Sequence, residues 1–197
     1  LANSVKKYID YFGVRCGNKS IIFTNNDSAY ETAISLNKKG INVTIVDIRD
    51  NSSSILVKNA KDAGIKIYWN HTVVDTKGYR RVNSIQIMEM SEDGTNVIGS
   101  KINLVCDSLS VSGGWTPMVH LFTQSGGKLK FRDSDQVFLP NTAMSDQISI
   151  GSCNGDFELD DIIKNEVSVG FGRGENEEAG DLKSQLEEQG LLVEHSQ

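Results

Sequence analysis

The first 70 residues alternate between short apolar runs and amphipathic helical segments. The runs at 20–24 and 41–48 are rich in Ile, Val and Phe, which is typical of strands buried on both faces. The whole pattern predicts helices over 5–12, 29–36 and 54–63, and strands over 20–24, 41–48 and 65–69. Strand–helix–strand units of about 30 residues form right-handed parallel crossovers, so this region predicts half of a mononucleotide-binding fold.

Beyond residue 70 the pattern changes to strict alternation of apolar and polar positions. Alternation indicates a sheet with one wetted face, and it predicts antiparallel strands over 72–76, 82–90 and 96–103. A buried strand over 104–111 is expected next. The remaining expected elements are a helical turn at 118–123, strands at 128–131, 136–140 and 148–153, and helices at 157–163 and 179–188. An antiparallel sheet between parallel strands is the distinguishing feature of this chain.

Charge is concentrated at one end of the chain. Residues 175–197 hold seven acids against one Lys, which accounts for the whole net charge of −6 and leaves the first 174 residues neutral. A neutral body without a basic face gives no support to nucleic-acid binding. No run approaches the roughly 18 apolar residues of a membrane span, and the start at Leu1 has no secretory signal. We therefore expect a soluble protein, and a chain that is a fragment of a longer one.

The three cysteines, Cys16, Cys106 and Cys153, lie far apart without a C-x-x-C pair. This favours reduced thiols in a cytoplasmic protein over a zinc site or a disulfide framework. Cys106 and Cys153 stand in apolar contexts that are typical of buried, inert thiols. The three His have no i,i+4 partner and no acid at a metal-ligand spacing. The sequence therefore predicts neither a catalytic residue nor a metal site.

The turn after the first strand stands where a dinucleotide fold carries its Gly-x-Gly-x-x-Gly sequence. Residues 24–29 read Thr-Asn-Asn-Asp-Ser-Ala without a glycine, and Asp27 places a carboxylate where a phosphate would lie. We expect this turn to act as the N-cap of the following helix instead. Asp47, at the end of the second strand, is either a ligand of a ribose hydroxyl or an ordinary exposed Asp.

Two glycine-containing turns follow later strands. The turn at 113–115 lies at the carboxyl edge where open α/β sheets bind ligands, and it either admits a flat cofactor or turns tightly around a packed Trp. The turn at 151–153 precedes a helix whose N-terminal amides can face an anion. The candidate cofactor contacts are therefore Gly113, Gly114, Trp115, Gly151, Ser152 and Cys153.

Three segments form unusual strings that occur together. They are TNNDSAY at 24–30, VSGGWTPMVHLF at 111–122 and QSGGKL at 124–129. In these strings the chain resembles the alpha subunit of the heterotetrameric sarcosine oxidases, and the similarity extends over about 1–172. The resemblance implies an α/β, Rossmann-like three-layer dinucleotide-binding fold of the glutathione-reductase type. In that fold a pyridine-nucleotide module, with a small antiparallel sheet, is inserted into a flavin-type module.

The resemblance also implies a division of the chain into three parts. Residues 1–105 would be the pyridine-nucleotide module, degenerate because its glycine turn is missing, 106–172 the return into the first (FAD/NAD-type) module, and 173–197 an acidic tail. The turn at 113–115 would then lie near the cofactor of the first module. The turn at 151–153 matches one where related flavoproteins carry Gly-Asp. Ser152 replaces that acid, which favours NAD or an unused site over flavin.

The family oxidises sarcosine at a flavin on its beta subunit and passes the one-carbon unit to tetrahydrofolate on its alpha subunit. Neither site falls on these residues, so the resemblance implies a non-catalytic, internal part of the alpha subunit that supplies scaffold and part of an NAD site. Its partners would be the other subunits, and the isolated chain should bind NAD weakly or not at all. Two alternatives are a self-standing pyridine-nucleotide–disulfide oxidoreductase domain, with a dinucleotide at 25–28 and Asp47, and a protein interaction module that uses the acidic tail.

Overall fold

The computed structural model describes residues 1–144, 147–157, 159–160 and 162–163. The chain divides into two compact units, Leu1–Gly114 and Trp115–Gln197. In the first unit, a parallel sheet is built from β1 (Lys19–Thr24), β2 (Asn42–Asp47), β3 (Lys66–Tyr68) and β7 (Ser108–Ser112), in the order β3-β2-β1-β7.

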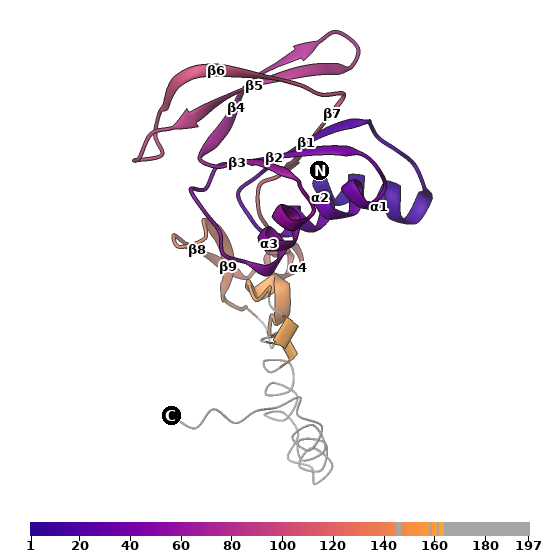
Figure 1. Ribbon diagram of the computed structural model, residues 1–197. Helices are drawn as coiled ribbons and strands as arrows, with labels where there is room; N and C mark the ends of the chain where they lie inside the picture. Colours follow the sequence, from indigo (N-terminus) through magenta and orange to yellow (C-terminus); the bar gives the residue numbers. More distant parts are fainter. Residues whose placement is uncertain (145–146, 158, 161, 164–197) are drawn as a thin grey trace. The chain divides into compact units, whose positions relative to one another are not determined.

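The first unit has three layers (Figure 1). One face of the parallel sheet is covered by α1 (Ala2–Phe12), α2 (Ser28–Lys38) and α3 (Ile55–Asp62). Against the other face lies an antiparallel sheet of β4 (His71–Gly78), β5 (Val82–Met90) and β6 (Val97–Val105), in the order β4-β5-β6. The predicted antiparallel insertion between parallel strands is therefore present, and it forms the third layer.

Both faces of the central strands are buried, which explains their continuous apolar runs. On the helix side, Ile22 and Ile45 pack against Tyr30 and Leu36 of α2. On the other side, Ile21 and Val46 pack against Ile85 and Ile87 of β5, together with Cys106. Because β5 has only one buried face, its sequence alternates, as predicted.

The helix ends follow ordinary capping chemistry at two of the three helices. α1 stops at Gly13, whose φ of 64° lies in the left-handed region that glycine adopts without strain. α3 begins at Ser54, whose hydroxyl oxygen accepts a hydrogen bond from the Val57 amide at 3.4 Å. α2 begins after Asp27, but the Asp27 side chain makes no capping hydrogen bond.

The predicted continuous strand over 104–111 is wrong, because the chain changes sheets within it. β6 ends at Val105 and β7 begins at Ser108. Between them, the Asp107 carboxylate accepts hydrogen bonds from the backbone amides of Asn18 and Lys19 at 2.8–2.9 Å. This contact leads the chain from the antiparallel sheet into the parallel one, where β7 pairs with β1 from Ser20↔Ser108 to Thr24↔Ser112. The first unit, which includes β7, runs to Gly114.

The second unit contains a helical turn and a hairpin. Its elements are α4 (His120–Gln124), β8 (Lys128–Arg132), β9 (Val137–Thr142) and the 3-10 helix η1 (Gly151–Asn154). The predicted strand over 148–153 is wrong. Ile150 has an extended backbone, with φ −131° and ψ 159°, but no strand of the described chain pairs with it, and the chain turns into η1. A strand needs a hydrogen-bonding neighbour, which apolar composition alone does not supply.

Two helices were expected near the end of the chain. Of the first, at 157–163, the described residues 159–160 and 162–163 are helical. The second, the acidic helix at 179–188, lies outside the described residues. Within the described part of the chain, no helix is both long and apolar enough to span a bilayer.

Candidate functional site

The candidate site lies at the carboxyl ends of β1, β2 and β7, where three loops meet. Side chains rather than bare backbone shape the turn after β1. The Asn26 amide nitrogen donates to the Ser112 carbonyl oxygen and hydroxyl oxygen, both at 3.1 Å, and the Asn26 amide oxygen accepts from the Ser28 hydroxyl at 2.6 Å. The Asn25 amide donates to the Gly113 carbonyl oxygen at 3.2 Å. These side-chain bonds tie the turn to the end of β7. The backbone amides of Asn25 and Asn26, the kind of donor that a glycine turn offers to a pyrophosphate, are bonded to the Ser112 carbonyl oxygen at 3.3 Å and to the Thr24 hydroxyl oxygen at 3.1 Å.

Asp27 does not cap α2 with its side chain, so this part of the N-cap prediction is wrong. One carboxylate oxygen accepts a hydrogen bond from Nη2 of Arg49 at 2.7 Å, and the Ser52 hydroxyl donates to both oxygens at 3.0 and 3.1 Å. Burial acts to raise the pKa of Asp27, but the hydrogen bonds from Arg49 and Ser52 outweigh it, and the pKa lies below its ordinary value. Asp27 is therefore an ionised partner of the loop that follows β2.

Asp47 is completely buried, so the expectation of an exposed strand-end Asp is wrong. One carboxylate oxygen accepts from the backbone amide and Nε of Arg49 at 3.0 and 3.1 Å. The other accepts from the Tyr30 hydroxyl and from Nη2 of Arg49, both at 2.8 Å. An ionised carboxylate offers about four acceptor positions, and all of them are used here. Asp47 consequently has no free lone pair and no exposed surface for a ribose hydroxyl.

Arg49 joins the two carboxylates into one network with Tyr30 and Ser52. Hydrogen bonds to Asp47, and then to Asp27, raise the pKa of Arg49 further above its ordinary value. Burial, followed by the hydrogen bond to Asp47, raises the pKa of Tyr30 and keeps its phenol protonated. With both acids ionised, the charges of Asp27, Asp47 and Arg49 sum to −1. Sequence reasoning missed Arg49, and the available signal was a cation two residues beyond the acid that ends β2.

The six candidate cofactor contacts are divided between the two units. Gly113 and Gly114 end the first unit, and Gly114 has a φ of 104° that favours glycine. A Cβ on Gly113 would meet no atom within 4 Å, so the described residues leave that position open. Trp115 begins the second unit and is about half exposed.

The other three contacts belong to η1 of the second unit. Gly151 is buried with a φ of 69°, and Ser152 is exposed. The Cys153 thiol is half-buried and donates to the Ile150 carbonyl oxygen at 2.9 Å. The buried thiol predicted at Cys153 is thus only partly buried. Cys106 is buried as predicted, and its pKa is raised by that burial and by the neighbouring Asp107. Among the described residues no group of His, Cys, Asp and Glu could hold a metal ion.

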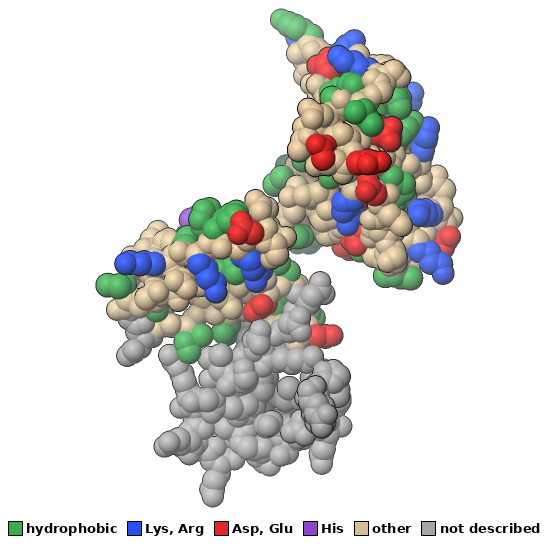
Figure 2. All heavy atoms as spheres, turned by 90° about the vertical axis from the view of Figure 1, so that its left-hand side faces the viewer, with side chains coloured by type: hydrophobic (Ala, Val, Ile, Leu, Met, Phe, Trp, Pro, Cys, Tyr) green, Lys and Arg blue, Asp and Glu red, His purple; other side chains and the backbone are tan. Residues whose placement is uncertain are grey.

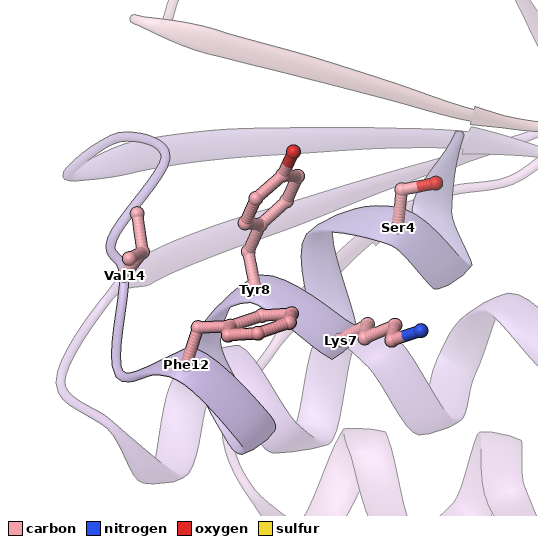
Figure 3. A pocket seen from close by; sticks show the side chains of 5 residues that line it. All are labelled: Ser4, Lys7, Tyr8, Phe12 and Val14. Atoms are coloured by element: carbon pink, nitrogen blue, oxygen red, sulfur yellow. The ribbon is translucent and has the colours of Figure 1, made fainter.

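A separate hollow of about 490 Å³ lies on α1 (Figure 3). It is lined by Ser4, Lys7, Tyr8, Phe12 and Val14. The Tyr8 and Phe12 rings are neighbours, with centroids 6.1 Å apart. None of the residues of the Asp27–Arg49–Asp47 network lines this hollow, and its charged group is a single ammonium. It is an apolar surface feature without a constellation for catalysis.

Comparison with known proteins shows the class of fold. The model of the pyridine nucleotide-disulphide oxidoreductase family matches residues 26–94, from the turn after β1 to the turn between β5 and β6. A thioredoxin reductase from T. acidophilum superposes with a TM-score of 0.62 and 16% identity, over 83% of this chain and 52% of that one. The flavoprotein disulfide reductase RclA from Escherichia coli superposes with a TM-score of 0.57 and 16% identity, over 83% of this chain and 37% of that one. The fold is therefore the predicted Rossmann-like, glutathione-reductase-like dinucleotide-binding fold.

Within that class, the chain is related in sequence to one part of the sarcosine oxidase alpha subunits, which confirms the predicted resemblance. It is 31% identical to the alpha subunit from Corynebacterium sp. strain P-1 over 172 residues, which are 86% of this chain and 18% of the relative. The subunit from Corynebacterium sp. strain U-96 is 32% identical over 79% of this chain and 16% of its own length. The chain thus spans less than a fifth of either relative.

Proposed function

We propose that this chain is an internal part of a sarcosine oxidase alpha subunit, and that it contributes a dinucleotide-fold scaffold rather than a catalytic site. The first unit holds no dinucleotide in this proposal. The observation that carries it is the Asp27–Arg49–Asp47 network, because it places a net negative charge where phosphates would lie and leaves Asp47 without a free acceptor. A dinucleotide therefore does not fit these loops, and we derive no reaction step there.

The second unit is proposed to be the return segment of a first, FAD/NAD-type module. Among its described residues it exposes Trp115, Met118, Leu121, Phe131, Phe138, Met144, Ile148, Phe157 and Leu159, and the large apolar side chains that it buries there include Phe122, Val137 and Leu139. Green side chains accordingly lie open on the described part of this unit in Figure 2. A two-stranded hairpin is marginally stable alone, and exposed apolar area of this kind needs further protein to cover it. An NAD site in that module, with contacts from 151–153 of this unit, and contacts with other subunits of the oxidase belong to the same proposal.

Titration of the purified chain with NAD and with NADPH by isothermal calorimetry tests the proposed function. We expect no binding heat at ligand concentrations up to about 1 mM, which corresponds to a binding free energy weaker than about −4 kcal/mol. A dehydrogenase that binds NAD, titrated in the same buffer, is the positive control. Micromolar binding of either nucleotide would contradict the proposal and favour the alternative of a self-standing pyridine-nucleotide oxidoreductase domain.

A further inference from the structure

Asp27 is the solvent-side member of the charge network. Its side chain is 34% exposed, whereas that of Asp47 is fully buried and that of Arg49 is 29% exposed. Asp27 belongs to the turn after β1, and both of its partners, Arg49 and Ser52, follow β2. The Asp27 carboxylate therefore bridges the two loops between which a dinucleotide fold holds its adenosine ribose.

Arg49 and Ser52, which donate hydrogen bonds to Asp27, carry the kinds of donor group that bind phosphates. Guanidinium and hydroxyl groups donate to carboxylate and phosphate oxygens in the same way, and charge-assisted bonds of this kind are short. Arg49 lies two residues beyond the acid that ends β2, and in this type of fold an Arg near that acid accommodates the 2′-phosphate of an adenosine. The hydrogen bonds of Arg49 to the two carboxylates use Nε and Nη2, and Nη1 makes none among the described residues.

We infer that Arg49 and Ser52 form an anion site that the chain's own Asp27 carboxylate occupies. Asp27 is then an internal competitor of a 2′-phosphorylated adenosine, and the site is blocked rather than lost. This inference rests on the proposed function, in which the first unit of the natural chain binds no dinucleotide. With Asp27 ionised the network carries −1 and repels a phosphate dianion, whereas an Asn at position 27 leaves a neutral network of nearly the same shape.

The Asp27→Asn variant tests this inference directly. Calorimetric titration with adenosine 2′,5′-bisphosphate is compared between the natural chain, Asp27→Asn and Asp10→Asn, which removes one surface carboxylate bonded to Lys6 and Ser35. We expect Asp27→Asn to bind at least about tenfold more tightly than the natural chain. Asp10→Asn is expected to behave as the natural chain does. In Asp27→Asn/Arg49→Gln the gain should disappear.

Three results would overturn the inference. They are a folded Asp27→Asn variant that binds no more tightly than the natural chain, an equal gain in Asp10→Asn, and a gain that survives Arg49→Gln. Inorganic phosphate and adenosine 5′-monophosphate are titrated as separate probes, and equal gains for either one would contradict the assignment to a 2′-phosphate. Circular dichroism verifies the fold of each variant, and Asp27→Ser replaces Asp27→Asn if the latter does not fold. Binding by the natural chain would instead contradict the proposed function, so the two failures are distinguishable.

Discussion

A single buried carboxylate, Asp47, organises the loops at the carboxyl end of the sheet. It is fully buried and all four of its acceptor positions are used by Tyr30 and Arg49. A buried ion stabilises a fold only while its partners remain, because removing one partner leaves the other charge without compensation. The four bonds therefore make Asp47 the position of the network with the strongest effect on stability.

We predict that Asp47→Asn lowers the free energy of unfolding by about 3 kcal/mol. The amide cannot accept the bonds from Nε and Nη2 of Arg49 and from Tyr30 at the same time. Asp10→Asn is the matched control, since its surface salt bridge with Lys6 is worth about 1 kcal/mol or less. Urea unfolding followed by circular dichroism measures both. Equal losses in the two variants would show that the buried network contributes no more than a surface pair.

At the residue scale, the sequence predicted where the site lies but not which side chains hydrogen-bond to one another in it. Asp27 and Asp47 were singled out because strand ends and helix starts can be located from periodicity. Tyr30 and Arg49 were not, because the helical pattern marks Tyr30 only as a core residue. Which carboxylate the phenol meets depends on how α2 lies across β2, and that is set by tertiary packing.

Among the elements, α1 is the helix with apolar side chains on two faces. Ala2 and Ile9 are buried against the sheet, with Val5 partly buried beside them. Tyr8, Tyr11 and Phe12 remain largely exposed, and the rings of Tyr11 and Phe12 meet edge to face at 5.0 Å. Only the first face stabilises the unit by burial.

We therefore expect the free energy of unfolding to fall much more when Ile9 is truncated than when Phe12 is. Ile9 is 7% exposed, and Ile9→Ala should cost about 2–3 kcal/mol because it leaves a cavity under the helix. Phe12 is 56% exposed, and Phe12→Ala should cost less than about 1 kcal/mol despite the larger side chain removed. Chemical denaturation of the two variants under the same conditions gives the comparison. A larger loss for Phe12→Ala would mean that the aromatic face of α1 is covered in solution.

The elements that the sequence predicted well are those whose burial is uniform along their length. β1 and β2 were found because both of their faces are buried, and β5 because only one face is. The break between β6 and β7 was missed, since it depends on the Asp107 carboxylate binding the distant amides of Asn18 and Lys19. The strand expected at 148–153 is absent because no strand of the described chain pairs with that segment, and an apolar run needs such a partner to form a strand.

At the scale of the whole molecule, the two units differ in how much of their own apolar surface they bury. The first has two apolar clusters, one on each side of the parallel sheet. The described part of the second exposes most of its large apolar side chains. Independent stability is therefore a property expected of the first unit alone.

A polypeptide of residues 1–114 should fold by itself and unfold in one cooperative transition. Residues 115–163 on their own should show no cooperative thermal transition, because a two-stranded hairpin with this exposure buries too little apolar area. Circular dichroism and proton NMR of the two polypeptides test this expectation. Dispersed amide signals from 115–163 alone would contradict both it and the proposed return into another module.

The order of strands in the parallel sheet has a consequence for biosynthesis. β1 lies between β2 and β7, and β7 follows the entire antiparallel sheet along the chain. As the nascent polypeptide leaves the ribosome, the backbone groups on one edge of β1 thus remain unpaired until Ser108–Ser112 have emerged. Open strand edges recruit other chains, so the interval in which the antiparallel sheet is translated is when this protein is most vulnerable to aggregation.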